Sequence, residues 1–204
     1  MSIPTATTTD RDRRPIGFGI FLIVTGAVAW YAAMQLITER IALLLNPDYV
    51  LNCDVNPLVS CGTVMTSPEA SLFGFPNPLL GVAGLVAPIA VGVALLAGAR
   101  FARWFWAVFL GGVTLAWVFV MWLFGEAVYD IGALCPYCMA VWAVTVPIFW
   151  YVTLRNLDRG APSAGRRQWA GVLMRNHSIA LTVWFLVLIA LIAQRFWSYW
   201  STLL

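Results

Sequence analysis

Five long apolar segments dominate the sequence, and they limit the chain to folds that cross a lipid bilayer. A hydrocarbon core about 30 Å thick is spanned by about 20 helical residues, because an α-helix rises about 1.5 Å per residue. Each segment has about this length and carries no charge except near its ends. Strands of a membrane β-barrel would instead alternate in hydropathy over about ten residues. The sequence therefore predicts an all-α membrane protein with five transmembrane helices, at residues 16–37, 79–97, 104–124, 135–154 and 179–196.

The composition supports the same class of protein. Hydrophobic residues make up 61% of the chain and charged residues only 10%, against about 25% charged in an ordinary soluble domain. A soluble protein of this size exposes about half of its residues to water, so this much apolar surface could not be hidden. The first apolar segment is too long for a secretory signal peptide, and no small-residue cleavage site follows it. It is therefore expected to remain as a membrane helix.

The basic residues predict how the helices are oriented. Ten of the twelve precede the first helix, or lie between the second and third or between the fourth and fifth helices, which places them on one side. The positive-inside rule makes this side cytoplasmic. The N-terminus is therefore expected in the cytoplasm and the C-terminus outside. The ten residues are Arg11, Arg13, Arg14, Arg100, Arg103, Arg155, Arg159, Arg166, Arg167 and Arg175.

The rest of the chain divides into four parts. Residues 1–14 are polar and are expected to form a disordered cytoplasmic tail. Residues 15–155 hold four helices and a long outer loop at 46–78, and residues 156–176 form a Gly/Pro/Arg-rich cytoplasmic linker. The fifth helix lies within 177–204, where the sequence RFWSYW is expected to form an aromatic belt at the outer interface.

Local signals refine this organisation. The first helix is expected to run on to Leu45, where Asn46-Pro47 would stop it, and Pro88 is expected to kink the second helix. In the outer loop, the sequence TSPE resembles a capping box with Thr66 as the cap. It predicts a short helix over residues 69–73.

All four cysteines fall on the outer side, where disulfides persist. Cys53 and Cys61 lie in the outer loop, and Cys135 and Cys138, in the sequence CPYC, open the fourth helix. Pro136 suits the first turn of that helix, and residues three apart share a helix face. The unpaired N–H groups of a helix start favour a thiolate. This pair is therefore suited to thiol–disulfide exchange.

Other uses of four cysteines compete with a redox relay. Zinc could take four thiolates, but zinc–thiolate sites belong to reducing compartments. A c-type haem would require a histidine where Met139 follows CPYC. Two inert structural disulfides are the main alternative, although a bridge between residues three apart in a helix adds little stability through loop entropy. Two close dithiols are better explained as a relay that passes a disulfide from pair to pair.

A relay needs an electron acceptor, and the membrane offers a lipid-soluble quinone. The sequence has no flavin fingerprint and no cluster of metal ligands. Oxidation of a dithiol releases two electrons, the number that a quinone takes up. Because about 30 mV is worth about 1.4 kcal/mol for this couple, a gap of about 100 mV makes the transfer strongly downhill. Menaquinone or ubiquinone is therefore the expected cofactor.

The run CDVNPLVSCGTVMTSPEASLFGFPNPLLG at 53–81, followed by CPYC at a helix start, resembles the vitamin K epoxide reductase family, specifically its bacterial disulfide-forming members. The resemblance implies a four-helix bundle around a quinone pocket near the outer surface of a bacterial cytoplasmic membrane. It implies that Cys53 takes electrons from a partner and that Cys61 passes them to Cys135. Cys138 would lie against the quinone and form an adduct with it.

The resemblance also assigns residues to the pocket. Ser67 and Asn77 match family positions that hold the loop and hydrogen-bond a quinone oxygen, and apolar residues of the second helix, such as Leu80, are expected to line the pocket. Trp142 stands where the vertebrate enzymes have a tyrosine, so epoxide chemistry is less expected. Many bacterial members continue into a thioredoxin-like domain, whereas this chain stops at Leu204, so a separate extracytoplasmic thioredoxin-like protein is the expected partner.

The sequence thus leads to one main hypothesis and two alternatives. The main hypothesis is a membrane thiol oxidoreductase that reoxidises a secreted thioredoxin-like protein and passes two electrons to a membrane quinone. One alternative keeps the relay but uses vitamin K epoxide as the acceptor. The other is a non-enzymatic membrane scaffold with two structural disulfides. Contacts with membrane lipid are expected, and none with nucleic acid or a metal ion.

Overall fold

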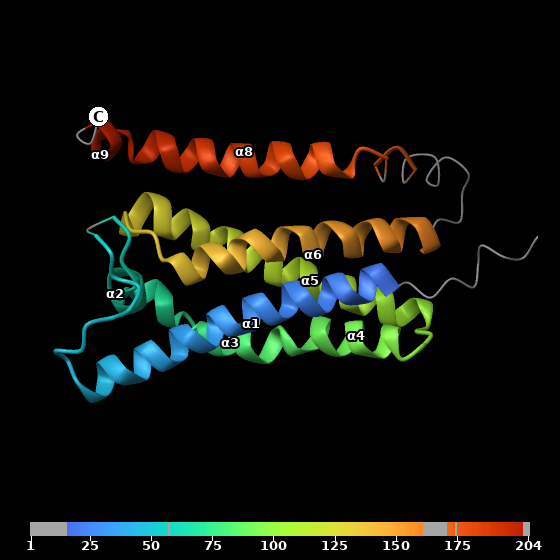
Figure 1. Cartoon of the computed structure of the whole chain (residues 1–204), viewed down its shortest axis with the longest axis horizontal. Helices are drawn as coiled ribbons and strands as arrows, with labels where there is room; N and C mark the ends of the chain where they lie inside the picture. Colours follow the sequence, from blue (N-terminus) through green and yellow to red (C-terminus); the bar gives the residue numbers. More distant parts are fainter. Residues whose placement is uncertain (1–15, 57, 161–170, 174, 202–204) are drawn as a thin grey trace, which may run out of the picture.

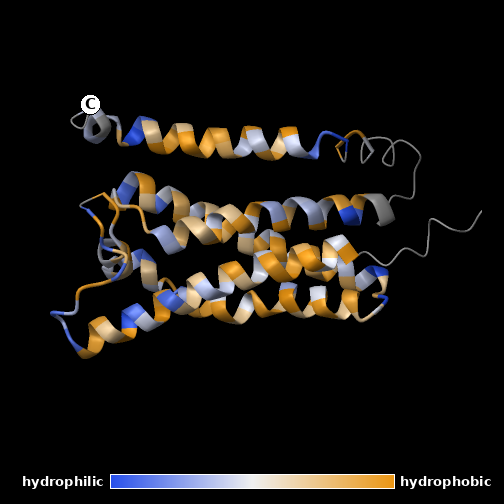
Figure 2. Ribbon diagram, viewed as in Figure 1, coloured by the Kyte–Doolittle hydropathy of each residue, from blue (hydrophilic) through white to orange (hydrophobic). Residues whose placement is uncertain are grey.

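The described residues form an all-α structure whose long helices lie side by side (Figure 1). The computed structural model describes residues 16–56, 58–160, 171–173 and 175–201. Figure 2 shows apolar residues along the helices and hydrophilic residues gathered toward both ends. Five helical spans are long and apolar enough to cross a membrane, which confirms the predicted fold class. They are Ile16–Leu45, Pro78–Leu96, Arg103–Ile131, Pro136–Leu157 and His177–Arg195.

The first helix extends beyond the length that a bilayer requires. α1 (Ile16–Leu45) has 30 residues, which correspond to about 45 Å at about 1.5 Å per residue. It ends immediately before Asn46 and Pro47, as predicted, and the N–H of Asn46 donates to the carbonyl of Ala42 at 2.9 Å. Because a hydrocarbon core is about 30 Å thick, part of α1 projects past it. This part lies at the end of the bundle formed by residues 46–77 and 126–135, named the cysteine end below.

The second span is broken into two helices. α3 (Pro78–Gly84) and α4 (Val86–Leu96) are separated at Leu85. Pro88 explains this position, because it has no N–H to donate to the carbonyl of Gly84, four residues earlier, and its ring crowds that carbonyl. The distortion predicted at Pro88 takes the form of this break at Leu85.

The first four spans form a bundle with close helix contacts. α1 packs on α4 and on α6 (Pro136–Gly160), and α6 packs on α5 (Arg103–Gly125). A Cβ added at Gly92 of α4 would lie 2.7 Å from the carbonyl oxygen of Gly19 in α1. Small residues of this kind let membrane helices approach closely, so the α1–α4 contact depends on them.

α5 ends in an irregular turn at the cysteine end. It continues into η3 (Glu126–Ile131), a π-helical segment of the kind often found at functional sites. Gly132 follows with φ of 69°, a left-handed conformation that glycine adopts without strain. This turn delivers Leu134 and Cys135 to the start of α6.

The loop after α1 contains two short helices. α2 (Cys61–Thr66) comes first, and the short helix predicted at 69–73 is a 3-10 turn, η2 (Pro68–Ser71). The predicted capping box is wrong in its register. Thr66 is the last residue of α2, and Ser67 is the residue before η2, with no side-chain cap bond. Because α2 occupies Thr66, the turn begins one residue later, at the proline.

The segment after the bundle also differs from its prediction. α6 continues to Gly160, so the linker predicted at 156–176 begins as helix. The polar residues in this stretch are compatible with helix, and glycine is a common helix terminator. Residues 161–170 lie outside the described residues, as does the tail predicted at 1–14.

The last helix lies along one side of the bundle (Figure 1). α8 (His177–Arg195) is followed by α9 (Trp197–Ser201), so the sequence RFWSYW is helical on both sides of Phe196. Phe196 is buried and Trp197 is exposed, so the aromatic belt stays a prediction and Phe196 packs inside the protein.

Candidate redox site

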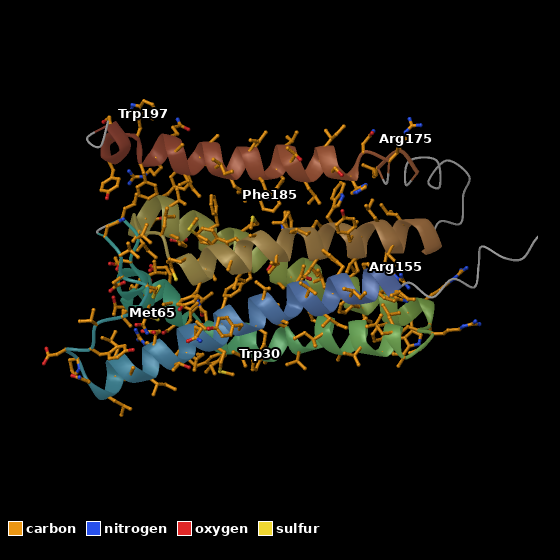
Figure 3. The ribbon with its side chains drawn as sticks, viewed as in Figure 1. Trp30, Met65, Arg155, Arg175, Phe185 and Trp197 are labelled. Carbon is orange, nitrogen blue, oxygen red and sulfur yellow. A yellow bond between two sulfur atoms is a disulfide. The ribbon has the colours of Figure 1, made fainter. Side chains whose placement is uncertain are left out.

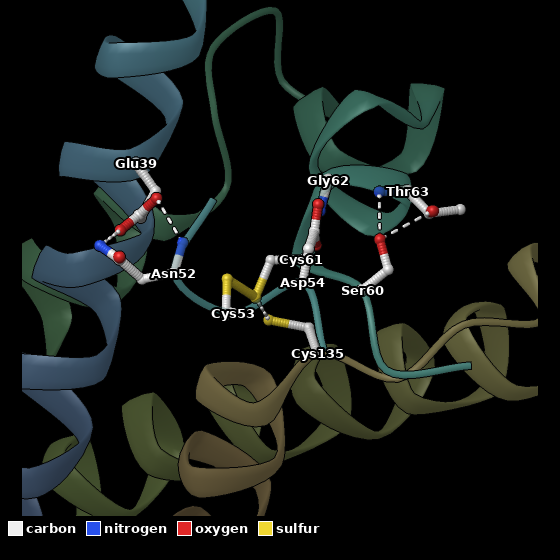
Figure 4. The surroundings of a disulfide bond; sticks show 9 residues. All are labelled: Glu39, Asn52, Cys53, Asp54, Ser60, Cys61, Gly62, Thr63 and Cys135. Atoms are coloured by element: carbon white, nitrogen blue, oxygen red, sulfur yellow. Dashed lines mark hydrogen bonds between the residues drawn. A yellow bond between two sulfur atoms is a disulfide. The ribbon is translucent and has the colours of Figure 1, made fainter. Parts of the chain in front are cut away.

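A disulfide joins Cys53 and Cys61 in the loop after α1 (Figure 4). The carboxylate of Asp54 accepts a hydrogen bond from the N–H of Gly62 at 3.0 Å, which closes the loop a second time beside the disulfide. Ser60 caps α2, because its hydroxyl accepts a backbone N–H of the first turn at 3.2 Å. Cys61 is therefore held at the start of a fixed helical turn.

A short β-bridge ties this loop to the segment before α6. The N–H of Ser60 donates to the carbonyl of Leu134 at 3.0 Å, and the N–H of Leu134 donates to the carbonyl of Leu58 at 2.8 Å. Cys61 follows Ser60 and Cys135 follows Leu134, so the bridge places these two cysteines next to each other.

The two cysteine pairs meet at their sulfur atoms. The Sγ atoms of Cys61 and Cys135 lie 3.1 Å apart, while Cys135 and Cys138 are free thiols. A hydrogen bond from the Cys138 side chain lowers the pKa of the Cys135 thiol below its ordinary value. A thiolate is the attacking species in disulfide exchange. The sulfurs of Cys61 and Cys135 are thus close enough for disulfide exchange between the two pairs.

The disulfide is less accessible than the sequence suggested. Cys53 is only 4% exposed and Cys61 is fully buried, although a soluble partner was expected to reach this pair. The segment that carries Cys53 is held against α1 by Glu39. Its carboxylate accepts from the Asn52 side chain at 2.8 Å and from the Asn52 N–H at 3.4 Å. The segment around Cys53 must therefore move before a protein partner can reach its sulfur.

Sequence reasoning missed the polar groups of α1 that hold the loop. Glu39 is buried, and the guanidinium of Arg40 donates a hydrogen bond to the carbonyl of Met65. The available signal was a pair of charged residues inside the apolar pattern of the α1 extension. Charged residues are almost never fully buried without partners, so their position was a signal that some contact holds them, although it did not identify the partner.

A cavity of about 790 Å³ lies inside the bundle beside Cys138. Its volume falls within the range of about 300–1,000 Å³ that is usual for small-molecule sites. Most of its walls are apolar, and Cys138 is the one cysteine that lines it. Ser67, Asn77 and Leu80, which the sequence predicted for the pocket, all line it together with Trp142.

The polar groups of the cavity suit a planar ligand with carbonyl oxygens. The hydroxyl of Ser67 is buried without a hydrogen-bond partner among the described residues, so it is free to donate to such an oxygen. The Asn77 amide bonds to the loop: its Nδ2 donates one hydrogen bond to the carbonyl of Glu69 at 2.6 Å, and its Oδ1 accepts from the N–H of Leu72 at 3.2 Å. Asn77 therefore holds the loop that carries Ser67.

Trp142 forms part of the apolar wall next to Cys138. It is buried, and its ring meets Phe124 edge-on with centroids 5.0 Å apart. A carbonyl ligand in this cavity would meet an indole at this position, which has one N–H donor and no hydroxyl.

A disulfide and a dithiol that meet beside an apolar cavity, in a multi-pass membrane protein, define a membrane thiol oxidoreductase. A model of the vitamin K epoxide reductase family matches residues 20–153, which include all four cysteines. The chain belongs to this family, whose members are membrane thiol/quinone oxidoreductases that generally work with thioredoxin-like partners. No curated protein matches the chain.

Proposed function

We propose that this protein reoxidises a reduced extracytoplasmic thioredoxin-like protein and passes the two electrons to menaquinone or ubiquinone. The observation that carries the proposal is the distance of 3.1 Å between the Sγ atoms of Cys61 and Cys135, with Cys138 lining the adjacent cavity. Disulfide exchange needs contact between sulfurs, and electron delivery needs a thiol at the acceptor. One loop movement at Cys53 completes the path from partner to cavity.

The exchange steps balance without a further oxidant. A partner thiolate attacks Cys53, forms a mixed disulfide and releases Cys61 as a thiolate. Cys61 attacks Cys135 in a Cys135–Cys138 disulfide, so that one S–S bond forms, one breaks, and Cys138 leaves as a thiolate. The second partner thiolate then attacks the partner sulfur bonded to Cys53, which completes the partner disulfide and frees Cys53 to attack Cys61. This last attack restores the Cys53–Cys61 bond and returns Cys135 as a thiol.

The cavity then receives the electrons. Bound quinone supplies an acceptor for two electrons and two protons. Cys138 provides the reacting sulfur, and the Ser67 hydroxyl donates a hydrogen bond that holds one carbonyl oxygen. Asn77 keeps the Ser67 loop in position, and Leu80 and Trp142 exclude water from the ring.

Vitamin K epoxide is the second candidate acceptor, because the matching family is named for its reduction. Trp142 favours quinone, since it removes the hydroxyl that vertebrate enzymes carry at the matching position. The scaffold alternative predicts two inert disulfides, whereas Cys135 and Cys138 are free and in reach of a disulfide. That arrangement supports an exchange function.

The orientation proposed for this function follows the basic residues. The cysteine end faces the extracytoplasmic side of a bacterial cytoplasmic membrane, and the N-terminus lies in the cytoplasm. A secreted partner can then approach the loop around Cys53 directly.

The test is quinone reduction by the purified full chain, supplied with a reduced thioredoxin-like protein. We expect wild type and Met139→Ala to reduce quinone, because Met139 does not line the cavity, and Cys138→Ala to be inactive. Menaquinone, ubiquinone and vitamin K epoxide are supplied separately to identify the acceptor. Full activity in Cys138→Ala would refute the mechanism, and turnover with the epoxide alone would replace quinone by the second candidate.

A further inference from the structure

The outer half of the fifth helix packs against the cysteine end of the bundle, where Leu188, Leu191 and Ile192 of α8 contact a buried cluster. No residue of α8 is itself buried. Phe196, directly after α8, is 7% exposed, whereas its neighbour Trp197 is 64% exposed. In Figure 3, Phe185 of α8 points toward the bundle and Trp197 points away from it.

Phe196 belongs to a buried cluster whose other members shape the redox site. The cluster includes Leu58 and Leu134, whose backbones form the β-bridge beside Cys61 and Cys135. It also includes Trp142, which lines the cavity next to Cys138. The other buried members are Val120, Phe124, Ala127 and Val128.

We propose that Phe196 is a positioning residue for disulfide exchange between Cys61 and Cys135. This inference rests on the proposed function for its role in turnover, but its geometry can be tested alone. The family match ends at residue 153, so the contact is made by a part of the chain that the match does not cover. The fifth helix thereby contributes a side chain that supports the four-helix bundle at its reacting sulfurs.

Small displacements matter at this site because disulfide exchange requires the two reacting sulfurs to be in contact. Two backbone hydrogen bonds hold the bridge, and the side chains of Leu58 and Leu134 anchor it in the buried cluster. Phe196 is buried in the same cluster as these two leucines, so its ring contributes to the packing that supports the bridge. Loss of the ring leaves a void that the leucines can enter. A displacement of about 1 Å at the reacting atoms can cost about a hundredfold in rate, so even partial relaxation is measurable.

The test isolates this geometry from quinone chemistry and from the partner. In the full chain carrying Cys53→Ala and Cys138→Ala, only Cys61 and Cys135 are left. Diamide oxidises these two thiols to one disulfide and takes up the two electrons and two protons. The rate at which the Cys61–Cys135 disulfide closes is measured in the chain that retains Phe196 and in the series Phe196→Leu, Phe196→Val and Phe196→Ala. Trp197→Ala is the control, because Trp197 is an exposed aromatic residue.

We expect closure to slow as the side chain shrinks, with Phe196→Leu close to wild type and Phe196→Ala slower by about tenfold or more. Trp197→Ala should close at the wild-type rate. The thermal unfolding midpoint is measured for each variant, and if Phe196→Ala does not fold, Phe196→Val decides the result. Equal rates across the folded series, or equal slowing in Trp197→Ala, would overturn the proposal.

Failure of the proposed function would look different. If disulfide closure depends on Phe196 but the chain with all four cysteines reduces no quinone, the positioning role stands and the proposed relay is refuted. If Phe196→Ala reduces quinone at the wild-type rate and its disulfide closure is unchanged, the proposed relay stands and the positioning role is refuted.

Discussion

Cys135 links the two cysteine pairs, because its sulfur lies 3.1 Å from that of Cys61 and its pKa is lowered by a hydrogen bond from its own partner, Cys138. That bond favours the thiolate, which is the form that attacks a disulfide. In the proposed cycle, the lowered pKa makes Cys135 a good leaving group when Cys53 attacks Cys61, while Cys138 faces the cavity. Each cysteine of the helix start therefore has a separate task that follows from its surroundings.

The pH dependence of exchange should report this hydrogen bond. Cys138→Ser keeps a donor and Cys138→Ala removes it, and neither variant can resolve the Cys61–Cys135 disulfide. Because the bond lowers the pKa of Cys135, the thiolate forms at lower pH while a donor is present. We expect the attack on Cys61 to reach half its maximal rate at higher pH in Cys138→Ala than in Cys138→Ser. The rate is followed by maleimide capture of the released Cys53, and identical midpoints would contradict the assignment.

The unpartnered hydroxyl of Ser67 predicts opposite effects on stability and binding. A buried hydroxyl without a partner costs free energy, so Ser67→Ala should unfold at the same temperature as wild type or higher without quinone. The same change removes the donor to a quinone oxygen, worth about 1 kcal/mol, and should raise the quinone KM about fivefold. Ser71→Ala, in the same turn, is the control. A lower unfolding temperature with an unchanged KM would make Ser67 a structural residue only.

At the scale of elements, the loop around Cys53 is closed by its attachment to α1. Glu39 makes both hydrogen bonds to Asn52, and a hydrogen bond to a charged group contributes about 1.5–3 kcal/mol. Glu39→Ala should therefore raise the population of molecules in which this loop has moved away from α1 by about tenfold. We expect a reduced thioredoxin-like protein to reduce the Cys53–Cys61 disulfide faster in this variant, in stopped-flow measurements. Thr38→Ala, at an exposed neighbour, should be unchanged, and a slower reaction in Glu39→Ala would rule out the attachment as a barrier.

The contact between α1 and α4 should be sensitive to a single methyl group. A Cβ at Gly92 would lie 2.7 Å both from the Gly19 carbonyl oxygen and from Cγ1 of Ile23, so the helices must separate. Such overpacking typically costs about 1–3 kcal/mol. Gly92→Ala should lower the thermal unfolding midpoint in detergent. Gly111→Ala, which has nothing within 4 Å of the added Cβ, should not lower the midpoint. An equal drop of the midpoint in Gly111→Ala would show that the α1–α4 contact is not the cause.

The long helices could be predicted from sequence because a bilayer leaves an apolar run of about 20 residues one way to satisfy its backbone. The kink before Pro88 follows from the same hydrogen-bond reasoning. The β-bridge at Leu134 could not be predicted, since two hydrogen bonds between distant loops leave no strand pattern in the sequence. The attachment at Glu39 was equally hidden, because its partner Asn52 is identified by folding alone.

For the whole molecule, the matched family region and the fifth helix meet at one point of functional importance. The region at 20–153 supplies both cysteine pairs and most of the bundle. The fifth helix contributes Phe196 to the cluster behind the bridge. Redox chemistry is thus concentrated at one end of the molecule, and the orientation of that end determines which compartment supplies the electrons.

Labelling of single cysteines in whole cells should establish this orientation. In a background without the native cysteines, Val55→Cys at the cysteine end and Ser198→Cys in α9 should react with a membrane-impermeant maleimide before lysis. Ala99→Cys, between α4 and α5, should react only after permeabilisation, because the arginines beside it favour the cytoplasm. All three positions are exposed, so a difference between them reflects the compartment and not burial. Labelling of Ala99→Cys alone in intact cells would reverse the topology and direct the relay toward the cytoplasm.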